Sequence, residues 1–152
     1  MQKTVNIKNN RARFEFELLD HYTAGIVLTG TEIKSIRLSK ARIADSFCEF
    51  NESGELFVVN MSIDLYAHGT HFNHQPKATR KLLLNRKELK KLQKEVSSSG
   101  FTIVPLRLYL NEKGRAKLDI ALAKGKKLYD KRENIKDRDN KRNLDRIKKN
   151  FK

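Results

Sequence analysis

The stretch FTIVPLRLYLNEKGRAKLDIALA, residues 101–123, decides the fold. In its second half every other residue is apolar, namely Ala116, Leu118, Ile120 and Leu122. An alternation with a period of two is typical of a strand that buries one face. The first half alternates in the same way, but Pro105 shifts the parity, which predicts a bulge or an edge position there. Residues 111–114 (NEKG) turn the chain, so the stretch predicts an antiparallel hairpin.

A second hairpin is predicted upstream. Residues 46–50 and 55–63 have strand character, and the segment NESG at 51–54 supplies a turn that contains glycine. Along the second strand four apolar residues share one parity and are expected to face the core: Phe57, Val59, Met61 and Ile63. Residues 24–31 (AGIVLTGT) add a further strand with a bend near Gly30.

Short helices are expected between these strands. Residues 9–22 fit either a strand or a short helix capped by Asn9 or Asn10, and the helix is the favoured interpretation. In the segment EIKSIR, the spacing of two isoleucines predicts a helical turn. Its open side is expected to carry Glu32, Lys34 and Arg37.

A longer helix is predicted after residue 85. Asn85 and Glu88 have the spacing of a capping box. The apolar stripe is expected to consist of Leu89, Leu92 and Val96. The segment SSSG at 97–100 ends this helix.

The sequence predicts about five strands, two hairpins and two or three short helices. Strands and helices do not alternate as in βαβ units, so a mainly β protein is indicated. The predicted architecture is an OB-type antiparallel barrel, closed or partly closed, with flanking α-helices, because closure removes exposed strand edges. We expect one domain over residues 1–127 and a basic tail over residues 128–152.

The charge of the chain predicts a polyanionic partner. Lys and Arg number 33 against 18 Asp and Glu, which gives a formal net charge of +15. Residues 124–152 alone hold thirteen basic and five acidic residues. Nucleic acid or an anionic membrane surface would supply the counter-charge. A membrane is disfavoured because the tail has no Trp and, drawn as a helix, no single apolar face. The tail is expected to be disordered when free and helical when a polyanion neutralises it.

Other classes of protein are excluded by what the sequence lacks. The sequence contains no run of about eighteen apolar residues, so no transmembrane helix is predicted. The N-terminal residues contain no apolar segment typical of a secretory signal. The single Cys48 excludes an internal disulfide, so a cytoplasmic location is expected. The sequence contains no nucleophile elbow, Walker loop or HExxH helix, so an enzyme is not predicted. The loop histidines His68, His71 and His74 lack a zinc-finger spacing, so neither a metal nor a cofactor is predicted.

Three sets of basic residues favour RNA among the polyanions. They are Lys34, Arg37, Lys40 and Arg42; Lys77, Arg80, Lys81, Arg86 and Lys87; and Lys124, Lys126 and Lys127. Contacts of such residues with phosphates supply affinity that does not depend on sequence. The rings of His21, Tyr22 and Phe72 either stack on unpaired bases or belong to the core. These residues predict a general single-strand or ribosomal RNA-binding protein.

Three segments carry a resemblance to a known family: GTEIKSIR at 30–37, PKATRKLLLNRKEL at 76–89 and GKKLYDKR at 125–132. From about Asn9 to the C-terminus the chain resembles the SsrA-binding protein (small protein B) family. The resemblance implies an OB-type barrel that binds the tRNA-like domain of transfer-messenger RNA. With elongation factor Tu, such a protein helps to deliver the alanine-charged RNA to stalled ribosomes for trans-translation, and it is not itself an enzyme.

The resemblance also implies the site. It places on or near the RNA-binding face Asn9, Glu32, Lys34, Ser35, Arg37, Lys124, Lys126 and Lys127. The second basic set adds Arg80 and Lys81. In the tail, the family has a segment associated with the decoding centre, and it is matched here by Tyr129, Asp130, Lys131 and Arg132. Ile147 matches an apolar position of the family's tail. The tail is expected to enter the vacant mRNA path.

Three positions depart from the family pattern. Thr23 stands where relatives often have Glu, and Ala78 where they often have Arg, so no RNA contact is assigned to either residue. Tyr129 stands where others carry His, and either ring can stack on a base.

Overall fold

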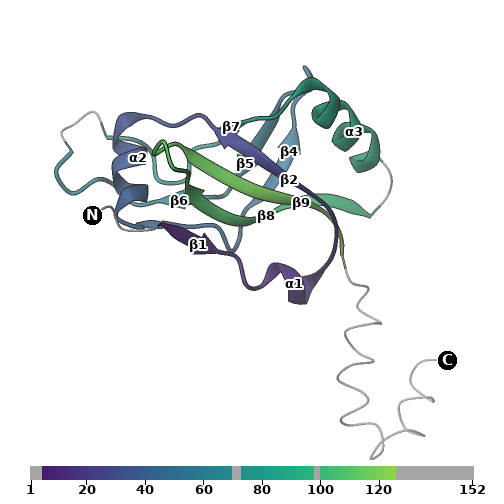
Figure 1. Cartoon of the computed structure of the whole chain (residues 1–152), viewed down its shortest axis with the longest axis horizontal. Helices are drawn as coiled ribbons and strands as arrows, with labels where there is room; N and C mark the ends of the chain where they lie inside the picture. Colours follow the sequence, from purple (N-terminus) through teal and green to yellow (C-terminus); the bar gives the residue numbers. More distant parts are fainter. Residues whose placement is uncertain (1–4, 70–72, 98–99, 126–152) are drawn as a thin grey trace, which may run out of the picture.

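The computed structural model describes residues 5–69, 73–97 and 100–125, and over these residues the chain forms nine strands and three helices (Figure 1). The strands are β1 (Asn6–Lys8), β2 (Phe16–Ile26), β3 (Ala41–Arg42), β4 (Phe47–Phe50), β5 (Leu56–Val59), β6 (Ser62–Ile63), β7 (Arg80–Leu83), β8 (Phe101–Leu110) and β9 (Ala116–Gly125). The helices are α1 (Ala12–Glu15), α2 (Gly30–Arg37) and α3 (Arg86–Val96). The predicted disorder of the tail falls outside the described residues.

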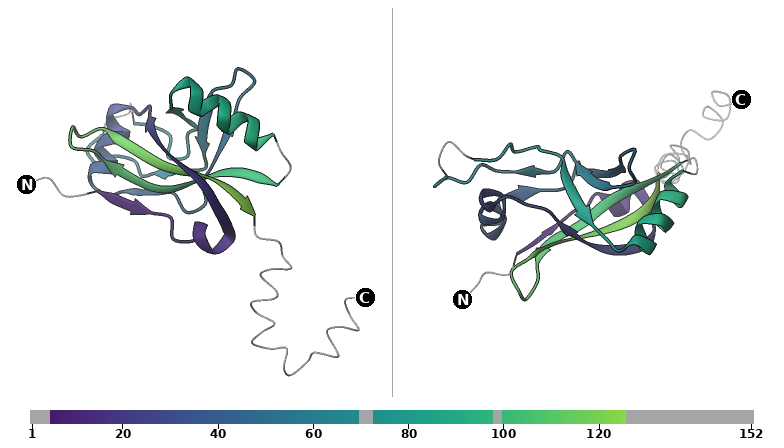
Figure 2. Two further views of the ribbon diagram at one scale, coloured as in Figure 1. Left: turned by 45° about the vertical axis from the view of Figure 1, so that its right-hand side comes forward. Right: turned by 90° about the horizontal axis from the view of Figure 1, so that it is seen from above.

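Six strands close into an antiparallel barrel. The order β8-β4-β5-β7-β2-β9 returns to β8, because β8 pairs with both β4 and β9. β1 pairs with the second half of β8, and β3 and β6 form a separate ribbon. Both figures place α2 and α3 at opposite ends of the barrel (Figures 1 and 2). The predicted mainly β class, OB-type barrel and flanking helices are confirmed.

The hairpin of residues 101–123 pairs β8 with β9 along nearly their whole length. The register between β8 and β9 shifts between Pro105 and Arg107, which is the predicted bulge. The apolar side chains of β9 are buried as expected, and Leu118 and Ile120 are both 0% exposed. Full burial of a side chain of this size contributes about 1.5–3 kcal/mol to folding.

The predicted parity of residues 55–63 was wrong in its first half. The buried residues are Leu56, Val58, Met61 and Ile63. Phe57 and Val59, which were expected in the core, are only half-buried. The reason is Asn60, whose φ of 64° breaks the strand between β5 and β6. Because the two strands do not run continuously through Asn60, their core-facing positions have opposite parity.

This break gives a testable prediction. Asn60→Val is expected to lower the free energy of unfolding by about 1–2 kcal/mol, because a side chain with a Cβ disfavours positive φ and a β-branched one most of all. Asn60→Gly is the matched control: it keeps the conformation and loses only the 3.1 Å hydrogen bond from Nδ2 to the Asp45 carbonyl. Urea unfolding measures both variants. Equal losses would assign the effect to the hydrogen bond and contradict the backbone explanation.

The favoured helix over residues 9–22 was largely wrong. Only α1 is helical there, its N-cap is Arg11 rather than Asn9 or Asn10, and β2 begins at Phe16. β2 pairs with β9 from Phe16 onward. Pairing along almost the whole length of a strand outweighs a local pattern that was ambiguous from the start.

The other helices follow the predictions more closely. α2 begins at the expected bend, where Thr29 and Glu32 form a capping box. α3 is capped by Asn85 and Glu88 as predicted, and Leu92 is fully buried in the core. The basic run before α3 contains strand β7, whose residues show no clear alternation of apolar and polar side chains. None of the helices in the described part of the chain is long and apolar enough to span a membrane.

Candidate nucleic-acid interface

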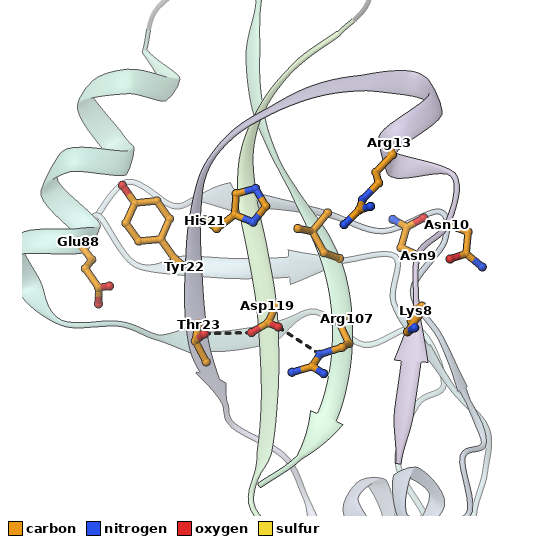
Figure 3. Close-up of a pocket in the computed structure, with 11 residues that line it drawn as sticks. Lys8, Asn9, Asn10, Arg13, His21, Tyr22, Thr23, Glu88, Arg107 and Asp119 are labelled. Carbon is orange, nitrogen blue, oxygen red and sulfur yellow. Dashed lines mark hydrogen bonds and ion pairs between the residues drawn. The ribbon is translucent and has the colours of Figure 1, made fainter. Parts of the chain in front are cut away.

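A groove of about 680 Å³ crosses the outer face of the barrel, where β1, β8, β9 and β2 lie in order (Figure 3). It is lined by Lys8, Asn9, Asn10, Arg13, His21, Tyr22, Thr23, Glu88, Leu106, Arg107 and Asp119. Three of these side chains are cationic and two are acidic. The groove is therefore polar and carries a small excess of positive charge.

The pairing of the strands places two cations side by side. Lys8 of β1 and Arg107 of β8 are register partners, so their side chains leave neighbouring strands at the same level. Arg13 of α1 adds a third cation from the helix that follows β1. Nothing in the local sequence groups these residues, because each comes from a different element.

Asn9 fastens the end of β1 to the bulge of β8. Its backbone N–H donates to the Leu106 carbonyl at 2.8 Å, and its Nδ2 donates to the Pro105 carbonyl at 2.9 Å. Only the amide nitrogen can donate to a carbonyl, so the orientation of the side chain is determined. Since Asn9 is only 7% exposed, it shapes the edge of the groove more than it offers a contact surface.

The two rings in the groove have different environments. Tyr22 is half-buried and packs against the core, and burial raises the pKa of its phenol, an effect that the nearby Lys91 ammonium opposes. His21 is exposed on β2, beside a register shift, and not in the core. Of the two, His21 is the ring available for stacking on a base (Figure 3).

A chain of polar contacts crosses the floor of the groove. The Thr23 hydroxyl donates to Asp119 Oδ1 at 3.0 Å, and Arg107 Nε donates to Asp119 Oδ2 at 3.2 Å (Figure 3). The Arg107 guanidinium also lies over the ring of Tyr109, with 3.9 Å from Cζ to the ring centroid. Thr23, to which the family pattern gave no RNA contact, thus takes part in the structure of the groove.

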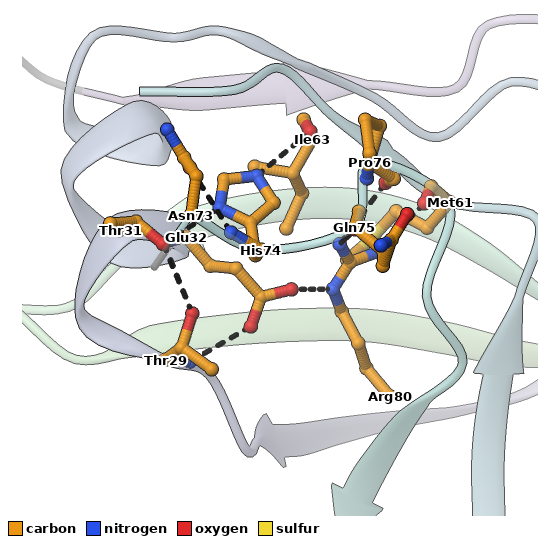
Figure 4. Close-up of polar contacts among 10 residues, drawn as sticks. All are labelled: Thr29, Thr31, Glu32, Met61, Ile63, Asn73, His74, Gln75, Pro76 and Arg80. Carbon is orange, nitrogen blue, oxygen red and sulfur yellow. Dashed lines mark hydrogen bonds and ion pairs between the residues drawn. The ribbon is translucent and has the colours of Figure 1, made fainter. Parts of the chain in front are cut away.

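A second set of predicted residues lies around α2, where Glu32 is buried. Its carboxylate forms an ion pair with Arg80 Nε and accepts a hydrogen bond of 2.8 Å from the Thr29 backbone (Figure 4). The prediction that Glu32 lies on the open side of the helix was wrong. The reason is that Arg80, 48 positions later, brings a guanidinium into the interior.

Arg80 connects α2 to the loop beyond it. Its Nη groups donate to the carbonyls of Met61 at 2.8 Å and of Gln75 and Pro76 at 3.1 Å (Figure 4). The side chains of Arg80 and Glu32 are 2% and 4% exposed. Ser35 is likewise buried. Glu32 and Arg80 therefore hold α2 in place from the interior, and none of the three residues offers an exposed contact surface.

His74 has a structural role in the same region. Its Nε2 lies 3.0 Å from the Ile63 carbonyl and its Nδ1 lies 2.8 Å from the Thr31 hydroxyl. A carbonyl only accepts, so Nε2 is the donor to Ile63, and the Thr31 hydroxyl is the partner of Nδ1. Within the described residues no three His, Cys, Asp or Glu side chains gather as metal ligands, and His71 lies outside them.

The exposed cations of the predicted site lie in separate places. Lys34 lies over the ring of Tyr66, with 5.5 Å from Nζ to the centroid, and Arg37 is exposed at the end of α2. Lys81 forms an ion pair of 2.6 Å with Glu55, and this hydrogen bond lowers the pKa of Glu55. Lys124 is exposed at the end of β9, across the barrel from α2 (Figure 1). The structure therefore does not gather these cations into one patch.

Some predicted residues lie outside the described part of the chain. They are Lys126, Lys127, Tyr129, Asp130, Lys131, Arg132 and Ile147. Conversely, sequence reasoning missed Lys8, Arg13 and Arg107, because they are single cations in separate elements. Only the antiparallel register of β1 with β8 could have paired Lys8 with Arg107.

Comparison with known proteins identifies the family. The family model described as "SmpB protein" matches residues 6–150. An SsrA-binding protein of Flavobacterium psychrophilum is 68% identical over 151 residues, covering 99% of this chain and 100% of the relative. One of Christiangramia forsetii is 64% identical and covers 100% of this chain and 96% of its own length.

A solved structure has the same fold. It is described as "tmRNA-SmpB: a journey to the center of the bacterial ribosome". It matches with a TM-score of 0.68 and 45% sequence identity, covering 82% of this chain and 86% of the other. Three findings agree on the family: the barrel fold, the match of the family model along nearly the whole chain, and the sequence identity to these relatives. The chain belongs to the SsrA-binding protein family.

Proposed function

We propose that this chain binds transfer-messenger RNA and acts with it on stalled bacterial ribosomes in trans-translation. The observation that carries the proposal is the cationic groove on a barrel whose relatives are named for binding SsrA. The structural relative is described together with transfer-messenger RNA and the ribosome, which supports the same partners for this chain. RNA binding rather than enzymatic catalysis is the proposed activity, and the cytoplasm, where ribosomes work, is its location.

The proposed function divides the chain in two. Residues 1–127 form the RNA-binding unit for the tRNA-like domain, and residues 128–152 occupy the decoding centre and the vacant mRNA channel. In the tail, Tyr129 stacks on a base, Asp130, Lys131 and Arg132 supply polar contacts, and Ile147 is an apolar contact needed after RNA binding. Elongation factor Tu, with alanine-charged RNA, completes the delivery complex.

Two kinds of residue serve RNA binding on the barrel. Direct phosphate contacts come from the exposed cations Lys34, Arg37 and Lys124 and from the cations of the groove. Lys126 and Lys127, which follow Lys124 in the sequence, belong to the same group. Lys81 contributes only when it leaves Glu55. Asn9, Glu32 and Arg80 act from the interior, by holding β1 and α2 in position, and Ser35 is buried in α2 beside them.

The salt dependence of binding tests the direct contacts. Lys34→Ala, Arg37→Ala, Lys8→Ala and Arg13→Ala are each expected to weaken binding of transfer-messenger RNA. Each also lowers the slope of log affinity against log salt by about 0.7–0.9, because one phosphate contact is lost. Filter binding at several salt concentrations measures both quantities.

The control for this experiment is Lys94→Ala on the exposed face of α3, away from the groove and from α2. It removes the same charge and is expected to leave the slope unchanged. A slope unaffected by any of the four variants would remove those residues from the interface. Equal affinity of the wild type for unrelated structured RNA would favour a general RNA-binding protein.

A further inference from the structure

The Arg107 side chain is held in one orientation before any ligand arrives. One face of its guanidinium lies over Tyr109, and its Nε donates to Asp119. Its two Nη groups have no hydrogen-bond partner among the residues that the structure describes. The side chain is 40% exposed, and we call its two Nη groups the unpaired fork of the guanidinium. This fork is open to solvent in the groove.

Asp119 is held from both sides. It lies in β9 between β2 and β8, and it is the register partner of Thr23 on one side and of Arg107 on the other. The Thr23 hydroxyl binds one carboxylate oxygen and Arg107 binds the other. At 29% exposure, Asp119 faces the groove less than Arg107 does. The carboxylate is thus engaged with the protein, whereas half of the guanidinium is not.

The chemistry of the unpaired fork selects its ligand. Two parallel N–H groups match the paired oxygens of a phosphate, and a planar guanidinium held in advance loses little freedom when it binds. Lys8, the register partner of Arg107 on β1, adds a second cation at the same level. An RNA phosphate is therefore the group that this part of the groove fits.

We propose that Arg107 binds an RNA phosphate in the groove, and that Asp119, held by Thr23, is a positioning residue that orients Arg107 for this contact. The inference rests on the proposed function. It differs from a simple charge effect, because it requires an acidic residue to increase the affinity for a polyanion.

The test compares Asp119→Asn with Arg107→Lys and Arg107→Met, using transfer-messenger RNA and the full-length protein. Asp119→Asn makes the protein more positive, so electrostatics alone would tighten binding. Positioning instead predicts binding weaker by about threefold to tenfold with the salt slope unchanged. Arg107→Lys also weakens binding at an unchanged slope, because it keeps the charge and loses the fork. Arg107→Met lowers the slope as well.

Three further variants separate positioning from a loss of folding. In an Arg107→Met background, Asp119→Asn is expected to cause no additional loss of affinity, because the residue that it orients is absent. Thr23→Ser keeps the hydroxyl and the affinity, whereas Thr23→Val weakens binding. Thermal unfolding of each variant identifies any that is not folded.

Tighter or unchanged binding by Asp119→Asn would overturn the inference, and so would full affinity in Arg107→Lys. If Lys8→Ala and Arg13→Ala weaken binding while these variants do not, only this inference fails. If no groove variant has an effect and transfer-messenger RNA still binds, the groove itself is not the interface and the proposed site fails with it.

Discussion

Arg80→Met is expected to lower the free energy of unfolding by about 3–5 kcal/mol, because it leaves the Glu32 carboxylate buried without its partner. Both side chains are nearly inaccessible, at 2% and 4% exposure. The substitution also removes the donors to the carbonyls of Met61, Gln75 and Pro76. Denaturation by guanidinium chloride measures the change, and the melting temperature is expected to fall by about 10–20 °C.

Two controls isolate the buried ion pair. Lys81→Met breaks a pair of similar type, with Glu55, but at a solvent-exposed position, so little change in stability is expected. The double variant Glu32→Met/Arg80→Met removes both buried charges and is expected to recover part of the loss. Equal effects of Arg80→Met and Lys81→Met would show that burial of the pair does not determine its contribution.

Removal of residues 128–152 is expected to abolish peptide tagging on stalled ribosomes and to leave most of the affinity for transfer-messenger RNA. The reason is that the groove and the α2 surface are formed by residues of the barrel and its flanking helices, and the last strand of the barrel ends at Gly125. Binding of transfer-messenger RNA and tagging in a reconstituted translation system measure the two activities. Equal loss of both would contradict the proposed division of the chain.

A tail of shuffled sequence is the matched control for this truncation. It keeps the ten basic and five acidic residues of positions 128–152 and changes only their order. If charge alone explains the tail, the shuffled protein tags normally. We expect it to bind RNA as the wild type does and to fail in tagging, because Tyr129 and the residues after it no longer stand in the proposed positions.

The sequence predicted best those elements whose signal is local. The alternation of β9 and the capping box of α3 depend on residues a few positions apart, and the structure contains them as expected. Phe57 and Val59 were placed wrongly because a single residue, Asn60, takes a left-handed conformation that propensity does not reveal. Strand β2 was mostly read as helix because its pairing with β9 is remote in sequence.

The candidate site could be predicted only in part for the same reason. The cations of α2 stand in a recognisable segment, but the burial of Glu32 depends on Arg80, 48 positions away. The groove combines residues from both ends of the described chain, so charge patterning along the sequence could not find it. Asp119 is the clearest case, since an acidic residue is not sought in a polyanion site.

The closure of the barrel has a consequence for the thermodynamics of recognition. β2, β8 and β9, which carry most of the groove, are hydrogen-bonded on both sides, and Asn9 anchors the end of β1 to β8. The spacing between the backbones of Lys8 and Arg107 is therefore set by the distance between neighbouring strands, about 4.8 Å, and cannot open or close by a hinge. In the proposed interface the groove is then a rigid template, and we expect the conformational adjustment on binding to fall on the RNA. Loops of the RNA that are already folded into the matching shape would then bind faster and more tightly than flexible ones of the same sequence.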